Sequence, residues 1–122
     1  MTNATEMKTY TGGCHCGAVR YEATMKLEGV ISCNCSICTK AGYILAFVPA
    51  AQFKLLSGND KLRDYQFNQK MVHHVFCEVC GIHPFGQGTM PDGNEVKAIN
   101  LRCVDDVDVE MLQLQKVDGR SR

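Results

Sequence analysis

Seven of the eight cysteines fall into three short motifs, and this grouping restricts the fold more than any other feature of the chain. The motifs are a C-x-C-G turn at residues 14–17, a C-x-C-x-x-C segment at residues 33–38 and a C-x-x-C-G turn at residues 77–81. Thiolates at such spacings converge on metal ions, and a chain of 122 residues forms one domain whose modest core benefits from metal cross-links. We therefore expect two metal sites.

The first and third motifs each present two sulfurs on one side of a tight bend. The first holds Cys14 and Cys16, the third holds Cys77 and Cys80, and a glycine follows the second cysteine of each. Glycine permits the positive φ that turns backbone amides toward the sulfurs and reduces their negative charge. Together the two pairs offer the closed tetrahedral set of structural zinc, although spacing alone allows other partitions of the seven cysteines.

The second motif brings three thiols, Cys33, Cys35 and Cys38, together within six residues and supplies no obvious fourth ligand. Catalytic zinc sites keep three protein ligands and leave the fourth position to water or substrate, whereas structural sites fill all four. The three local cysteines therefore favour a site that carries chemistry.

Three other interpretations of the cysteines remain open at this point. Eight cysteines can form a disulfide framework in a secreted protein, and thiolates alone can hold an iron–sulfur cluster, although the spacings match neither ferredoxin pattern. Both clusters can also be structural zinc sites, with Cys103 or a histidine completing the second. A lone cysteine such as Cys103 is more often a small buried hydrophobic residue than a ligand.

The charge balance and the apolar pattern limit which binding partners and which cellular compartment we expect. Thirteen basic and thirteen acidic residues cancel, so nothing draws the chain as a whole to nucleic acid or to an anionic membrane. Residues 1–11 contain no apolar run of signal-peptide length, and no later segment reaches the length of a membrane span. We expect a cytoplasmic protein, and a reducing compartment favours metal ligation over disulfides.

The apolar pattern predicts a mainly β protein. Short strands are expected at residues 18–23, 29–32, 43–48, 71–76, 96–101 and 109–114. Residues 53–56 and 62–67 read as a hairpin around a turn at residues 58–60. The only helical candidate is about one turn near residues 50–53, because no segment shows a sustained helical period with caps.

The three motifs with their flanking residues resemble those of the glutathione-dependent formaldehyde-activating enzyme family, which also includes centromere protein V-like members. The resemblance runs from about Tyr10 to Val109 and includes the later segments His83-Pro84-Phe85-Gly86 and Asn100–Asp105. We therefore expect a zinc domain at residues 10–114, an N-terminal tail at residues 1–9 and a C-terminal tail at residues 115–122.

The resemblance also implies a fold and two ligand sets. The fold is Mss4-like, or β-tent: a single domain of antiparallel sheets joined through zinc. The structural zinc is held by Cys14, Cys16, Cys77 and Cys80. The catalytic zinc is held by Cys33, Cys35 and Cys38, which gives two Zn²⁺ ions per chain.

Three thiolates around zinc predict a thiol substrate. They leave the site with a formal charge of minus one, so a bound water is less acidic than at a site of three histidines, whereas zinc stabilises a thiolate well. The resemblance implies that this thiol is glutathione and that it adds to formaldehyde to give S-hydroxymethylglutathione, the reaction of a carbon–sulfur lyase.

The remaining candidates are a proton donor and cations that bind carboxylates. The oxygen of the adduct needs a proton or a hydrogen bond, and His73, His74 and His83 flank the third cysteine motif. Lys40, Lys70 and Arg102 are candidates for binding the carboxylates of glutathione, although solvated surface positions are the default for such residues.

A second hypothesis is a zinc module without enzymatic activity that presents a β surface to a macromolecule. The centromere protein V-like branch of the family and the small number of obvious acid and base residues motivate this hypothesis. The chain contains no basic run, which weakens the version with nucleic acid as the partner.

Overall fold

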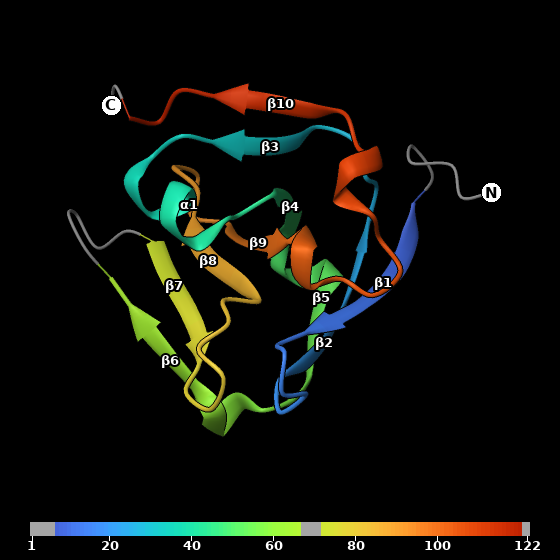
Figure 1. The fold of residues 1–122 in the computed structure, drawn as a ribbon, viewed down its shortest axis with the longest axis vertical. Helices are drawn as coiled ribbons and strands as arrows, with labels where there is room; N and C mark the ends of the chain where they lie inside the picture. Colours follow the sequence, from blue (N-terminus) through green and yellow to red (C-terminus); the bar gives the residue numbers. More distant parts are fainter. Residues whose placement is uncertain (1–6, 67–71, 121–122) are drawn as a thin grey trace.

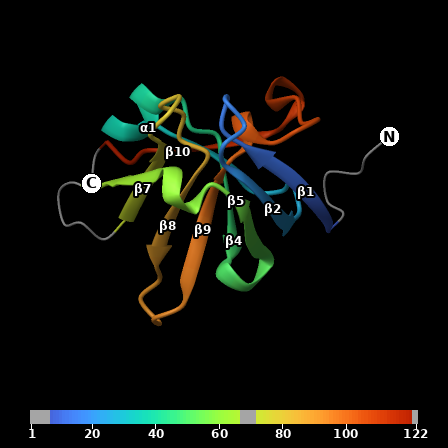
Figure 2. The same ribbon diagram turned by 90° about the horizontal axis from the view of Figure 1, so that it is seen from below.

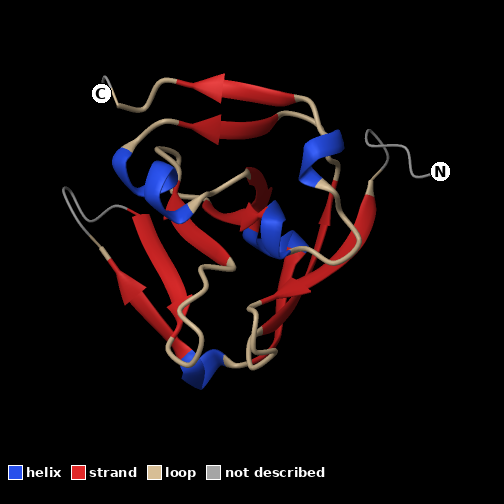
Figure 3. Cartoon of the chain, viewed as in Figure 1, coloured by secondary structure: helices blue, strands red, loops and turns tan. Residues whose placement is uncertain are grey.

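The computed structural model describes residues 7–66 and 72–120. Over these residues the chain forms two β-sheets, one of three strands and one of seven, with short helical segments at their ends (Figures 1 and 3). This is the mainly β, single-domain, Mss4-like architecture that the family resemblance implies. Lys70 and the first residue of the strand expected at residues 71–76 lie outside the described residues.

The smaller sheet is antiparallel and has the order β1-β2-β5. Its strands are β1 (Lys8–Gly13), β2 (Arg20–Met25) and β5 (Phe53–Ser57). Alternate residues of β2 are buried, with Tyr21, Ala23 and Met25 facing the core, because successive side chains of a strand point to opposite faces.

The larger sheet has the order β10-β3-β4-β9-β8-β7-β6. Its strands, in chain order, are β3 (Val30–Cys33), β4 (Leu45–Pro49), β6 (Leu62–Tyr65), β7 (Val72–Cys77), β8 (Phe85–Thr89), β9 (Glu95–Asn100) and β10 (Leu114–Val117). All neighbours pair antiparallel except β10 and β3, which run parallel along one edge (Figure 1). The long β8–β9 pair projects to one side when the molecule is turned (Figure 2).

The core lies between the two sheets. The ring of Tyr21 stacks on Phe53 at 5.3 Å between centroids and meets the edge of Phe85 at 5.8 Å. Ile99 and Leu101 are fully buried beside them. Aromatic contacts between β2, β5 and β8 therefore join the smaller sheet to the larger one.

The hairpin expected from residues 53–67 is wrong. β5 pairs with β2 in the smaller sheet, whereas β6 pairs with β7 in the larger one. The turn between them, which includes a 3-10 helix at Asn59–Lys61, carries the chain from one sheet to the other. Gly58 at its start has φ of 88°, and a Cβ there would lie 2.3 Å from the carbonyl oxygen of Ala18, so the turn is pressed against the smaller sheet.

Among the described residues, one helical segment matches the expectation, and four others, including the 3-10 helix at Asn59–Lys61, do not. The expected turn near residue 50 is confirmed as a 3-10 helix at Ala50–Gln52. An α-helix, α1 (Ser36–Ala41), was not expected, and a further 3-10 helix covers Leu101–Cys103. The strand expected at residues 109–114 is wrong, because the Asp108 side chain accepts a hydrogen bond from the N–H of Glu110 and caps a 3-10 helix at Val109–Met111. Within the described residues, no helix is long and apolar enough to cross a membrane.

Candidate metal centres

The first cysteine cluster joins the two sheets. Cys14 follows β1 and Cys16 lies in the turn to β2, whereas Cys77 ends β7 and Cys80 lies in the turn after it. The four Sγ atoms lie within 4.8 Å of one another. The two motifs therefore bring four sulfurs into one compact set, although they follow strands of different sheets.

The geometry of this cluster fits a tetrahedral zinc ion. The Sγ atoms of Cys14 and Cys16 are 3.5 Å apart, and those of Cys16 and Cys77 are 3.7 Å apart. Sulfurs held at the usual zinc distance stand about 3.8 Å from each other along the edge of a tetrahedron. The N–H of Val19 also donates to Cys14 Sγ at 3.3 Å, as expected for a thiolate ligand.

Glycine closes both turns of this cluster as the sequence predicts. Gly17 has φ of 83° and donates its N–H to the carbonyl of Cys14 at 3.3 Å. Gly81 has φ of 79° and donates to the carbonyl of Cys77 at 2.8 Å. Open space surrounds the position of a Cβ at either glycine, so the backbone conformation itself is what requires glycine there.

The titration of these cysteines also fits a cation. Burial raises the pKa of Cys80, but N–H donors of Ile82 and Cys16 outweigh it and lower this pKa to about 6. The N–H of Ala18 lowers the pKa of Cys16, but desolvation and the neighbouring thiols outweigh it and raise this pKa to about 11. Thiolates this close together repel one another, and a bound dication would neutralise their charge.

The second cluster lies where β3 meets α1. Cys33 ends β3, Cys35 is the residue before the helix, and Cys38 lies within it, so one helical turn brings the three side chains together. Their Sγ atoms lie within 4.8 Å of one another. Gly42 ends the helix with φ of 71° and donates its N–H to the carbonyl of Cys38 at 3.0 Å, which fixes the segment behind the sulfurs.

The second cluster contains three ligand atoms, and the described part of the chain adds no fourth. Among the described residues, no further Cys, His, Asp or Glu side chain joins Cys33, Cys35 and Cys38 within the same distance. Burial raises the pKa of Cys38, and the neighbouring Cys35 and Cys33 raise it further. Burial also acts to raise the pKa of Cys35, but the N–H and thiol of Cys38 hold it below its ordinary value. Three thiols without a fourth in the described part of the chain suit an ion that accepts its last ligand from outside.

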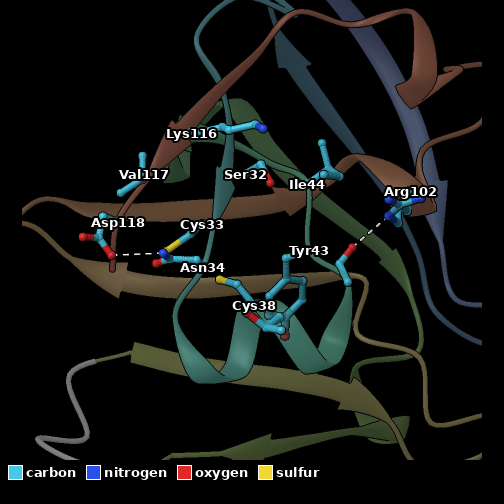
Figure 4. A pocket seen from close by; sticks show the side chains of 12 residues that line it. Ser32, Cys33, Asn34, Cys38, Tyr43, Ile44, Arg102, Lys116, Val117 and Asp118 are labelled. Atoms are coloured by element: carbon cyan, nitrogen blue, oxygen red, sulfur yellow. Dashed lines mark hydrogen bonds between the residues drawn. The ribbon is translucent and has the colours of Figure 1, made fainter. Parts of the chain in front are cut away.

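A cavity of about 520 Å³ opens beside the second cluster (Figure 4). In this view Arg102 lies at one end of it and Asp118 at the other, with Cys33 and Cys38 between them. Its lining consists of Ser32, Cys33, Asn34, Cys38, Thr39, Gly42, Tyr43, Ile44, Arg102, Lys116, Val117 and Asp118. The cavity thus combines two thiols with two cations and one carboxylate.

The C-terminal strand forms one wall of this cavity. β10 pairs with β3, and the N–H of Asn34 donates to the carbonyl of Val117 at 3.1 Å. The Asn34 amide also donates to Asp118 Oδ1 at 3.0 Å and accepts from the N–H of Arg120 at 2.9 Å. Sequence reasoning assigned these residues to a tail and therefore missed Lys116 and Asp118. Their only signal in the sequence is the apolar Leu114 and Val117 nearby.

Tyr43 is a third residue that sequence reasoning missed. Its hydroxyl lies 3.0 Å from Nδ1 of His83, its ring stacks near that of His74 at 6.4 Å, and its side chain packs with Cys38. Burial lowers the pKa of both His74 and His83, so both favour the neutral form. His73 instead pairs with Asp64 at 2.6 Å, on the other face of β7.

The other candidates belong to neither sulfur cluster. Arg102 donates from Nε to the carbonyl of Gly42 at 2.9 Å and lines both the cavity above and a second one of about 700 Å³. Lys40 lines only the second. Cys103 belongs to neither cluster, and burial raises its pKa to about 11. All eight cysteines are free thiols, so the disulfide framework is excluded in this structure.

Two comparisons with known proteins agree with this geometry. Residues 9–116 match the family model described as glutathione-dependent formaldehyde-activating enzyme. The crystal structure of a Rhodobacter sphaeroides protein superposes with a TM-score of 0.77 at 27% sequence identity. The match covers 88% of this chain and 99% of that one, so the two chains share the fold over nearly their whole length.

Proposed function

Because the chain belongs to the glutathione-dependent formaldehyde-activating enzyme family, we propose that it catalyses reversible carbon–sulfur bond formation between glutathione and formaldehyde. The product of the forward reaction is S-hydroxymethylglutathione. The observation that carries this proposal is the cavity beside the second cluster, where two of the three clustered thiols, Cys33 and Cys38, share a lining with a set of charges suited to this tripeptide.

The chain's own residues divide into a structural and a reactive metal centre under this proposal. Cys14, Cys16, Cys77 and Cys80 hold a structural zinc that joins the two sheets. Cys33, Cys35 and Cys38 hold the second zinc. A zinc ion bound in the second centre would stabilise the thiolate form of the substrate, which is the nucleophilic form of sulfur.

The charges that line the cavity complement those of glutathione. At neutral pH the tripeptide carries three charged groups in total, two carboxylates and one ammonium group, and these are distributed on the two sides of its thiol. The cavity offers two cations, Arg102 and Lys116, and one carboxylate, Asp118. A volume of about 520 Å³ lies within the range of sites for small molecules. The cavity therefore favours an enzyme over the interaction module that the sequence also allowed.

The reaction needs one proton at oxygen. The sulfur of the thiolate forms a bond to the carbonyl carbon, the electron pair of the C=O π bond moves to oxygen, and this oxygen takes a proton. We assign this proton to the hydrogen-bonded pair of Tyr43 and His83. Burial raises the pKa of Tyr43, so its hydroxyl keeps its proton at neutral pH and remains a donor.

The test is exchange NMR on glutathione and formaldehyde with and without the zinc-loaded chain. The adduct also forms spontaneously, so the measured quantity is the added exchange rate. We expect wild type to accelerate exchange and Cys35→Ser to abolish the acceleration while the protein stays folded. N-acetylcysteine, which has the thiol but lacks the ammonium group and one carboxylate, should be accelerated less. If wild type neither binds glutathione nor changes the rate, the proposal is wrong.

A further inference from the structure

Lys97 occupies a core-facing position of the larger sheet. It shares one face of β9 with Ile99, which is fully buried, because alternate residues of a strand point to the same side. Its partners across the sheet are Val48 of β4, which is buried, and Gln87 of β8. Lys97 is only half-buried, but a lysine is still unusual at such a position, since charged side chains mostly lie on the surface.

The surroundings of the amine are aromatic. Nζ lies 5.3 Å from the ring centroid of Phe53 and 5.7 Å from that of Phe85, and it donates to Oε1 of Gln87. Among the described residues, no carboxylate forms an ion pair with it. Burial lowers the pKa of Lys97, although the charge of Glu95 acts in the opposite direction. The amine is thus more readily deprotonated than that of an exposed lysine.

A cavity of about 250 Å³ adjoins this amine, between β5 and strands β6 to β9. Its lining consists of Phe53, Leu55, Asn59, Leu62, Arg63, Asp64, Val75, Phe85, Gln87 and Lys97. The other two charged residues of this set have partners, because Arg63 pairs with Glu78 at 2.6 Å and Asp64 with His73 at 2.6 Å. Lys97 therefore supplies the one unpaired ionisable group of the described lining, within walls that are mainly apolar.

We propose that this cavity is a carbonyl-binding site in which Nζ of Lys97 condenses with a small apolar aldehyde. The neutral amine attacks the carbonyl carbon, a C–N bond forms, and the oxygen takes up a proton to give a carbinolamine. Loss of water then leaves an imine, so no oxidant or reductant takes part. None of the residues that line this cavity belongs to either cysteine cluster or to the cavity beside the second one.

Two features select this class of ligand. The apolar walls, formed mainly by Phe53, Phe85 and the aliphatic residues around them, favour an uncharged substituent, and the volume admits a molecule of only a few carbon atoms or one ring. Desolvation of a lysine in an apolar pocket is the usual way in which proteins prepare an amine for imine formation. The proposal is independent of the thiol reaction, since it involves neither metal centre.

The experiment is reductive trapping at single-lysine resolution. The full chain, loaded with zinc, is treated near pH 7 with benzaldehyde and cyanoborohydride, digested, and the modified fraction of each lysine is followed by mass spectrometry. We expect Lys97 to react several-fold faster than Lys54, an exposed lysine of β5 next to Phe53. Equal rates at the two positions would show that Lys97 merely covers the aromatic rings, and would overturn the proposal.

Two further comparisons test the site itself. Lys97→Arg keeps the charge over Phe53 and Phe85 and should remove the fast-reacting lysine without a change in the far-UV circular dichroism spectrum. Glyoxylate, an aldehyde with a carboxylate, should label Lys97 more slowly than benzaldehyde relative to Lys54. Faster labelling by glyoxylate would contradict the apolar ligand class. Thiol-dependent exchange with formaldehyde should be the same in wild type and Lys97→Arg.

Discussion

The two cysteine clusters should differ in their effect on stability. In the first cluster, four sulfurs from both sheets meet, and Cys77 and Cys14 are almost fully buried. Structural zinc in small domains contributes about 10–16 kcal/mol of apparent folding free energy, so one of four ligands accounts for about 2.5–4 kcal/mol. A domain of this size loses about 3–5 °C of melting temperature per kcal/mol, which predicts a decrease of about 8–20 °C for Cys80→Ser.

Cys35→Ser should cost much less. The second cluster joins β3 to the helix that directly follows it, and β3 is also held by its pairing with β4 and β10. We expect a loss below about 1 kcal/mol, which corresponds to about 5 °C or less, together with loss of one zinc ion per chain. Cys103→Ser is the matched control, since this half-buried thiol belongs to neither cluster.

The measurement is thermal unfolding by circular dichroism together with metal analysis of the same samples. The reasoning predicts that Cys80→Ser unfolds at the lowest temperature, and that Cys35→Ser unfolds close to Cys103→Ser but with less zinc. Equal decreases for Cys80→Ser and Cys35→Ser would refute the division into a structural and a reactive centre.

Three further predictions concern the cavity, a turn and a histidine. Lys116→Gln should raise KM for glutathione about threefold with kcat unchanged, as for a partly exposed ion pair, whereas Lys54→Gln should have no effect in the same assay. Gly58→Ala should lower the free energy of unfolding by about 3 kcal/mol, because φ is 88° and a Cβ would meet the backbone at Ala18. Gly93 has φ of 90° and open space around it, so Gly93→Ala should lower the free energy of unfolding, measured in urea, by only about 1 kcal/mol. This variant separates the cost of the backbone conformation from the cost of a steric contact. Burial lowers the pKa of His74 in the folded state, so the unfolded chain binds more protons at this residue. The free energy of unfolding should therefore decrease as pH falls below about 6.5. His74→Gln should reduce that pH dependence in urea titrations.

The sequence predicted the features that depend on local spacing. The ligand pairs of the first cluster arise from turns of four or five residues, and the three sulfurs of the second lie within six. Most buried strands were also found, because an alternating or continuous apolar pattern is visible in β2, β3, β4 and β9. Helix α1 was missed because six residues are too few to show a helical period.

Long-range pairing was the part that the sequence did not predict. A short turn between two apolar segments usually joins strands of one sheet, but here β5 pairs with β2 and β6 pairs with β7, so the turn at Gly58 connects two sheets. β10 carries only a short apolar signal, and its parallel partner β3 lies far away in the sequence. The wall of the cavity that contains Lys116 therefore followed only from the structure.

The pairing of β10 with β3 also sets an order of events. The sulfurs of the second cluster are neighbours in the sequence, so they can gather as soon as one turn of α1 forms. The wall beside them requires closure of the long loop between Cys33 and Val117, whose entropic cost delays such contacts during folding. We therefore expect the growing chain to gather the sulfurs of the second cluster before the C-terminal strand adds the cavity wall that we propose to select a substrate.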